Sequence, residues 1–113
     1  MDVEKWESEF KKGFSKPFAL LSLANSPNYP YGIIKAIKNV TENKFEIAGS
    51  NIYPLLSQME KDGLIAEEIE DLGQEKSRKT YRLTSSGEEF LALLKDAMIN
   101  FTKIIQTMLD IAD

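Results

Sequence analysis

The segment from Gly49 to Gly63 carries side chains that could hydrogen-bond to a nucleic acid, at the spacing of a helix. Its polar members are Asn51, Ser57, Gln58 and Lys61. Its apolar members recur at i, i+3, i+4 and i+7, and they are Ile52, Leu55, Leu56 and Met59. Amide, hydroxyl and ammonium groups bind base edges and phosphates, whereas Glu60 and Asp62 would repel phosphates and are expected to face away. Gly63 is expected to end the helix as its C′ residue.

A predicted β-hairpin follows this helix. We expect strands at about residues 64 to 69 and 80 to 83, joined by a polar link at residues 71 to 77 that is longer than the two-residue minimum. Lys76, Arg78 and Lys79 gather at this turn and could bind phosphates or enter the minor groove. The combination predicts a winged helix-turn-helix that docks on DNA. The alternative is a polar helix face that simply meets water.

Four runs of the chain match a known pattern: Tyr29-Pro30-Tyr31-Gly32-Ile33-Ile34-Lys35, Ser50-Asn51-Ile52-Tyr53-Pro54-Leu55-Leu56, Met59-Glu60-Lys61-Asp62-Gly63-Leu64-Ile65 and Arg78-Lys79-Thr80-Tyr81-Arg82-Leu83-Thr84-Ser85-Ser86-Gly87. In these runs the chain resembles the PadR family of transcriptional regulators. The similarity covers roughly residues 18 to 94 and implies that Tyr53 contacts the DNA backbone. Two departures prevent transfer of operator sequence and wing geometry. The family's Gly-Thr is Ser50-Asn51 here, and its Gly-Arg-Pro wing tip is Glu75-Lys76-Ser77.

Composition limits the classes of function. The 113 residues suit one domain, and the 42% apolar and 28% charged content is ordinary for a globular protein. No apolar run reaches the ~18 residues of a membrane span, and the charged N-terminus does not resemble a signal peptide. Since the chain has no cysteine, we expect a cytoplasmic protein. Without histidine or cysteine we expect no metal, no cofactor and no enzymatic activity.

The net charge of −4 is unevenly distributed. Residues 85–113 hold two lysines against five acidic residues, whereas the remainder holds twelve basic and thirteen acidic residues. The basic residues cluster around Lys11, Lys35 and Lys76. This distribution leaves room for a small basic face, although such lysine clusters are also typical of solvated surface.

The other elements are predicted from helix signals. We expect an amphipathic helix at residues 2 to 13, a second helix opened by Pro17, and a third from Pro30 to about Val40 with Ile33, Ile34 and Ile37 inward. Residues 41 to 48 form a loop with one short extended stretch at residues 45 to 47. A capping box of Ser85 and Glu88 begins the last helix.

The last helix carries an apolar stripe at alternating spacings of four and three, which consists of Phe90, Leu94, Ala97, Phe101, Ile104 and Met108 and continues to Ile111. The stripe is too long for its own small body to cover, so it predicts a homodimer. Residues 1–84 would form the DNA-binding domain and residues 85–113 the dimerisation helix. Trp6, Phe10 and Phe14 are expected to pack on the long helices of the dimer. The alternative is a pocket for a small aromatic effector between these aromatics and Phe101 or Met98, as in some proteins that this chain resembles.

These observations predict a mainly α fold with a small β-hairpin (α+β), a winged helix-turn-helix plus a long C-terminal dimerisation helix. We expect a cytoplasmic homodimer that regulates transcription on double-stranded operator DNA, as a repressor that occludes a promoter. The alternative is a winged-helix protein-interaction module without DNA affinity. The operator, the regulated genes, any inducer and the sign of regulation stay open.

Overall fold

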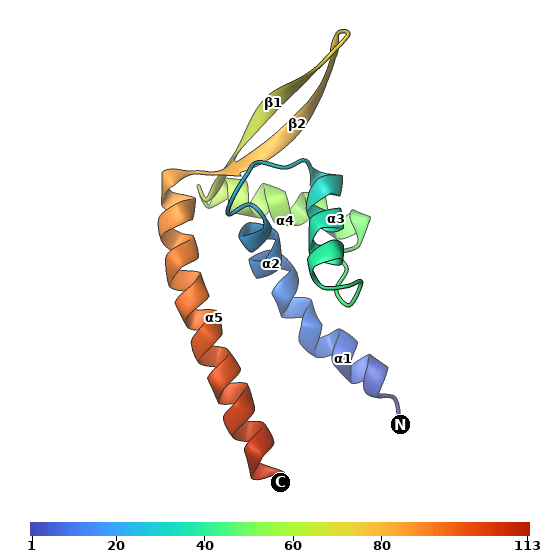
Figure 1. The fold of residues 1–113 in the computed structure, drawn as a ribbon, viewed down its shortest axis with the longest axis vertical. Helices are drawn as coiled ribbons and strands as arrows, with labels where there is room; N and C mark the ends of the chain where they lie inside the picture. The colour runs from blue at the N-terminus through green and yellow to red at the C-terminus, as the bar shows by residue number, and fades with distance from the viewer.

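The computed structural model describes residues 1–113 and contains five α-helices, one 3-10 helix and a two-stranded antiparallel sheet. In chain order the elements are α1 (Val3–Lys11), η1 (Lys12–Phe14), α2 (Ser15–Ser22), α3 (Pro30–Val40), α4 (Gly49–Lys61), β1 (Ile65–Gly73), β2 (Lys76–Leu83) and α5 (Ser85–Ile111). Helices α2, α3 and α4 form a central body. The hairpin projects from one end of this body, while α1 and α5 extend toward the other end, where both termini lie (Figure 1). The predicted fold class is confirmed.

The core lies where α2, α3 and α4 meet the base of the hairpin. It comprises 14 buried residues: Ala19, Leu20, Leu23, Ile33, Ile34, Ile37, Ile47, Ile52, Leu56, Met59, Ile65, Tyr81, Leu83 and Leu91. The inward stripe of α3 and three of the four predicted apolar residues of α4 are in this set, and Leu55 packs against it half-buried. The helical spacing of apolar residues therefore identified the core faces of both helices.

Two helix starts differ from the expectations. Helix α2 begins at Ser15, so Pro17 lies in its first turn instead of opening it. A first turn tolerates proline because its N–H groups have no partner within the helix. Helix α5 is capped by Thr84, whose hydroxyl accepts a hydrogen bond from the Gly87 N–H at 3.0 Å, so the predicted capping box of Ser85 and Glu88 is wrong by one position.

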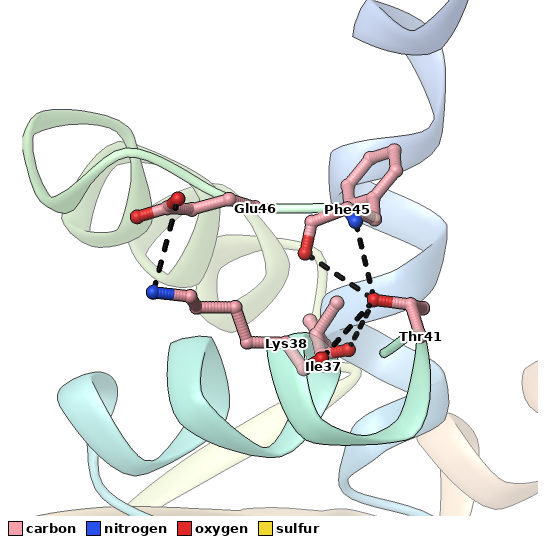
Figure 2. A network of polar contacts seen from close by, with 5 residues as sticks. All are labelled: Ile37, Lys38, Thr41, Phe45 and Glu46. Carbon is pink, nitrogen blue, oxygen red and sulfur yellow. Dashed lines mark hydrogen bonds and ion pairs between the residues drawn. The ribbon is translucent and has the colours of Figure 1, made fainter. Parts of the chain in front are cut away.

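The predicted loop between α3 and α4 is present, and it contains no strand. The Thr41 hydroxyl orders this loop, because it donates to the Ile37 carbonyl at 2.8 Å and accepts from the Phe45 N–H at 3.2 Å (Figure 2). Lys38 and Glu46 add an ion pair at 4.0 Å across the same loop. These contacts fix the direction in which the chain enters α4.

The hairpin is longer and its turn tighter than expected. Strand β1 pairs with β2 from Ile65 opposite Leu83 to Gly73 opposite Lys76, with an irregularity between Asp71 and Gly73. Only Gln74 and Glu75 form the turn, both in the left-handed region with φ of 52° and 61°. The predicted seven-residue link is therefore wrong. Both faces of the projecting ribbon meet solvent, so its strands need no apolar alternation, and polar strand residues resemble a loop in the sequence.

Both ends of the hairpin base are attached to the body. Tyr81 and Asn28 exchange two backbone hydrogen bonds, at 3.0 and 2.8 Å, which ties β2 to the link between α2 and α3. On the other side, the Thr84 N–H donates to the Leu64 carbonyl at 3.0 Å. Gly87 packs so closely on that carbonyl that a Cβ atom there would overlap the Leu64 oxygen. The start of α5 is thus fixed against the chain that leaves α4.

Candidate nucleic-acid interface

The exposed surface of α4 has an outer face and two flanks, because successive residues are rotated by about 100°. Ser57 and Lys61 lie on the outer face, opposite the buried stripe. Asn51 and Gln58 share one flank, since seven residues make nearly two turns. Tyr53 is 62% exposed and occupies the other flank, on the side of the hairpin. All five predicted contact residues of α4 are therefore accessible, but they do not form one line.

The acidic residues of α4 differ in their placement. Glu60 lies seven residues after Tyr53 and shares the flank near the hairpin. Burial is the main cause of the raised pKa of Tyr81, and the neighbouring charge of Glu60 adds to it. Glu60 thus lies beside the predicted interface, contrary to the expectation that it faces away. The fixed spacing of a helix leaves it no other position once the apolar stripe is buried.

Asp62 faces α2 instead of the hairpin. Its carboxylate accepts a hydrogen bond from the Gln58 amide nitrogen at 3.1 Å and forms an ion pair with Lys16 at 3.8 Å. Asp62 therefore holds the Gln58 amide so that its carbonyl oxygen is left without a protein partner. The amide nitrogen carries two N–H groups and gives one to Asp62, so Gln58 still offers an acceptor and a donor, the pair that a bidentate contact with adenine needs.

The N-terminus of α4 is open to an anion. Its N-cap residue is Ala48, which has no side chain that could accept a hydrogen bond from the first turn. The Asn51 N–H donates to the Ala48 carbonyl, but the N–H groups of Gly49 and Ser50 have no such partner, and with the positive end of the helix dipole they favour phosphate. Ser50 and Asn51 are exposed in this turn, so their side chains can reach the same ligand.

The basic residues of the hairpin lie on β2, not at its turn as expected, and all but one are paired. Arg78 binds Glu70 at 3.1 Å, Lys79 binds Glu67 at 3.3 Å, and Arg82 binds Glu68. These acidic partners are all on β1. Hydrogen bonding and charge from Glu70 and Glu67 raise the pKa of Arg78 and Lys79, respectively. Lys76, next to the turn, is the hairpin cation without an ion pair.

The first helix of the helix-turn-helix, α3, adds two residues that the sequence reasoning did not select. Tyr31 is 64% exposed, and the ammonium group of Lys35 lies 5.7 Å from the centre of its ring. Lys35 forms no ion pair. The basic cluster of Lys35 and Lys38 was the sequence signal for this surface, but Lys38 is engaged with Glu46. Lys35, Lys61 and Lys76 are therefore the unpaired cations of α3, α4 and the hairpin.

The sequence model of the transcriptional regulator PadR-like family matches residues 19–93, which include α3, α4, the hairpin and the start of α5. The chain belongs to this family. Among solved structures, it is similar to a PadR family transcriptional regulator from Eggerthella lenta, with 27% identity, a TM-score of 0.77, and coverage of 95% of this chain and 91% of the other.

Two further solved structures are similar to this chain. A transcriptional regulator from Clostridium thermocellum shares the fold, with a TM-score of 0.77, 23% identity, and coverage of 88% of this chain and 96% of the other. Bacillus subtilis PadR in complex with operator DNA is 27% identical, with a TM-score of 0.60 over 68% of this chain and 44% of that chain. The helix-turn-helix and hairpin described above are thus those of a PadR-like regulator.

The C-terminal helix of this PadR-like chain exposes its apolar stripe. Phe90 and Leu94 line a cavity of about 480 Å³ against α2 and the end of α4. Beyond them the stripe leaves the body: Ala97 is exposed, and Phe101, Ile104 and Met108 are 48%, 55% and 61% exposed. The predicted dimerisation residues therefore divide into two that also face their own subunit and four that face solvent in the isolated chain.

Two of the three N-terminal aromatic residues are also exposed in the isolated chain. Trp6 and Phe10 are 74% and 63% exposed, whereas Phe14 is half-buried and contacts Phe18 with ring centres 5.7 Å apart. Two cavities of the subunit, one against α5 and one between α2 and α3, are lined by neither Trp6 nor Phe10. No helix has the length and apolar character needed to cross a membrane.

Proposed function

We propose that this PadR-like chain is a homodimeric, sequence-specific DNA-binding repressor that acts in the cytoplasm by occluding a promoter. The proposal is carried by one observation: a helix with an exposed polar face and an uncapped N-terminus lies beside a projecting hairpin, on a body whose family consists of transcriptional regulators. Operator DNA in the complex of Bacillus subtilis PadR supports the same ligand class for this chain.

In this proposal α4 enters the major groove. Asn51, Ser57 and Gln58 would read or approach base edges, while Tyr53 and the N-terminus of α4 would bind the backbone. Lys35, Lys61 and Lys76 would neutralise phosphates, because they are cations that no carboxylate of the chain already binds. Lys79 would join them after exchanging Glu67 for a phosphate.

The homodimer is supported by the exposed half of α5. This helix has 27 residues, about 40 Å, and only Gly87 and Leu91 near its start are buried. Residues 1–84 would then bind DNA and residues 85–113 would join two copies. The spacings of four and three along the stripe suit a second identical helix, and Trp6 and Phe10 would be covered by the same assembly. A small aromatic effector would have to bind between these helices.

Binding to DNA across a salt series tests this function. Sites selected from a random DNA pool serve as probes, and footprinting upstream of the protein's own gene then identifies a natural operator. We expect the logarithm of the binding constant to fall linearly with the logarithm of salt concentration, with about 0.9 units of slope per neutralised phosphate. A folded dimer that shows no salt-dependent DNA binding would favour the interaction module.

A further inference from the structure

Arg78 of β2 is the one hairpin cation with side-chain contacts on two other segments of the chain, β1 and the link between α2 and α3. Its Nε donates to Glu70 Oε2 at 3.1 Å and its Nη2 donates to Glu70 Oε1 at 3.4 Å, which joins β2 to β1. The Cζ atom of the same guanidinium lies over the Tyr29 ring, 3.7 Å from its centre. Tyr29 belongs to the link between α2 and α3, so Arg78 connects the hairpin with the helix-turn-helix body.

Tyr29 is itself fixed in place. Its N–H donates to the Asn28 side-chain oxygen at 2.9 Å, and the Asn28 backbone pairs with Tyr81 of β2. The ring packs against Gly32 of α3, where an added Cβ atom would come within 2.8 Å of a Tyr29 ring carbon. The Tyr29 ring that contacts Arg78 is therefore held against the start of α3.

The other hairpin cations lack this arrangement. Lys79 and Arg82 each have an ion pair with β1 and no cation–π contact, and Lys76 has neither. Arg78 already uses Nε and Nη2 on Glu70 and one face on Tyr29, so a bidentate phosphate contact through these two nitrogens would require it to leave Glu70, and only Nη1 stays fully free. A two-stranded hairpin is marginal by itself and needs such a tie to keep one orientation.

We propose that Arg78 is a positioning residue, which clamps the hairpin between Glu70 and Tyr29 so that the hairpin and α4 meet DNA in a fixed relation, and that it is not a phosphate contact. The proposal rests on the proposed DNA-binding function. In this role Arg78 supports DNA binding by holding the hairpin in position and not by its charge. The two roles therefore predict opposite changes in DNA affinity when Glu70 is replaced.

Three variants separate the two roles. Glu70→Gln and Tyr29→Leu leave Arg78 charged but remove one of its supports, and Arg78→Lys keeps the charge but not the bidentate, stacked geometry. On sites selected with the unmutated protein, each should weaken binding roughly two- to fivefold, the size expected from losing an exposed ion pair or cation–π contact. The salt slope should stay unchanged. Far-UV circular dichroism and thermal unfolding confirm that each variant is folded.

A phosphate-binding Arg78 gives the reverse pattern. Glu70→Gln would then free the guanidinium and strengthen binding, Arg78→Lys would bind nearly as well as the unmutated chain, and Tyr29→Leu would have little effect. Either tighter binding of Glu70→Gln or a near-normal Arg78→Lys overturns the proposal. Glu67→Gln is the matched control, because it makes the same change of charge on the same strand but frees Lys79, and it should strengthen binding.

A measurement without DNA keeps this test separate from the proposed function. Backbone ¹⁵N relaxation should give rigid amides for hairpin residues 66–72 and 77–82 in the unmutated chain. Glu70→Gln and Tyr29→Leu should lower the order parameters of these amides, whereas Glu67→Gln should not. Unchanged order in all three variants would refute the clamp even if DNA binding occurs, and loss of order would support the clamp even if no DNA binding is found.

Discussion

Replacing Phe101 by aspartate should convert the protein into a folded monomer that no longer binds its operator specifically. Phe101 lies in the middle of the apolar stripe of α5, in the part of the helix whose residues are exposed in the isolated chain. It is 48% exposed in the isolated chain. In the proposed homodimer the substitution therefore removes contacts with the second subunit and leaves the core of the first unchanged.

The expected magnitude follows from the exposed area. A phenylalanine buries about 150–250 Å² when fully covered, so roughly 100 Å² of Phe101 is left for a partner helix to cover. At about 25 cal/mol per Å², covering it stabilises the dimer by roughly 2.5 kcal/mol for each copy and about 5 kcal/mol for two. Losing about 5 kcal/mol weakens the dimer by three to four orders of magnitude. Two desolvated carboxylates would cost several kcal/mol more.

Sedimentation velocity and DNA binding of Phe101→Asp decide the outcome. Gln106→Glu is the matched control, because it places a carboxylate about 140° round the same helix, on its polar side, and should leave the dimer intact. A folded Phe101→Asp monomer with only non-specific DNA affinity is the expected result. A folded dimer that still binds its operator would refute the assignment of this stripe, and an insoluble subunit would show that Phe101 belongs to its own core.

Other substitutions test other parts of the structure. Gly87→Ala should lower the free energy of unfolding by about 1–3 kcal/mol, as expected from overpacking a tight contact, and chemical denaturation measures this. Replacing the left-handed turn Gln74-Glu75 by Asn-Gly should raise the free energy of unfolding of the hairpin by about 1 kcal/mol, visible as slower amide exchange. Asn51→Ala should change the preferred base at one position by about 1–3 kcal/mol in a new random-pool selection, with an unaltered salt slope. Lys76→Ala should instead weaken binding to all sequences and reduce the salt slope by about one unit in a titration.

The sequence predicted the core faces of α3 and α4 well because their apolar residues recur with the period of a helix. Ile33, Ile34 and Ile37 in α3, like Ile52, Leu56 and Met59 in α4, are buried as their spacing requires. The positive φ of 76° at Gly63 agrees with its predicted place after α4. Which residues of a helix face the core depends on their spacing along that helix, so the local pattern was enough to predict their burial.

The hairpin and its surroundings depended on contacts between distant residues. Nothing local marks Glu70 as the partner of Arg78, or Tyr29 as the ring beneath it, because the hairpin turn and the fold of the α2–α3 link bring them together. The role of Gly87 was hidden for the same reason, since the carbonyl that it packs against lies 23 residues earlier, at Leu64. Which exposed cations stay unpaired is likewise a property of the folded chain.

The close packing of Gly87 on the Leu64 carbonyl has a consequence for the proposed homodimer. It leaves no hinge between the end of α4 and the start of α5, so α4 and α5 of each subunit would turn together. In a symmetric pair, a change in the crossing angle of the two α5 helices would rotate both α4 helices out of phase with DNA grooves that recur about every 34 Å. The spacing between half-sites that the pair accepts would then be set at the C-terminal end of the molecule, remote from the DNA.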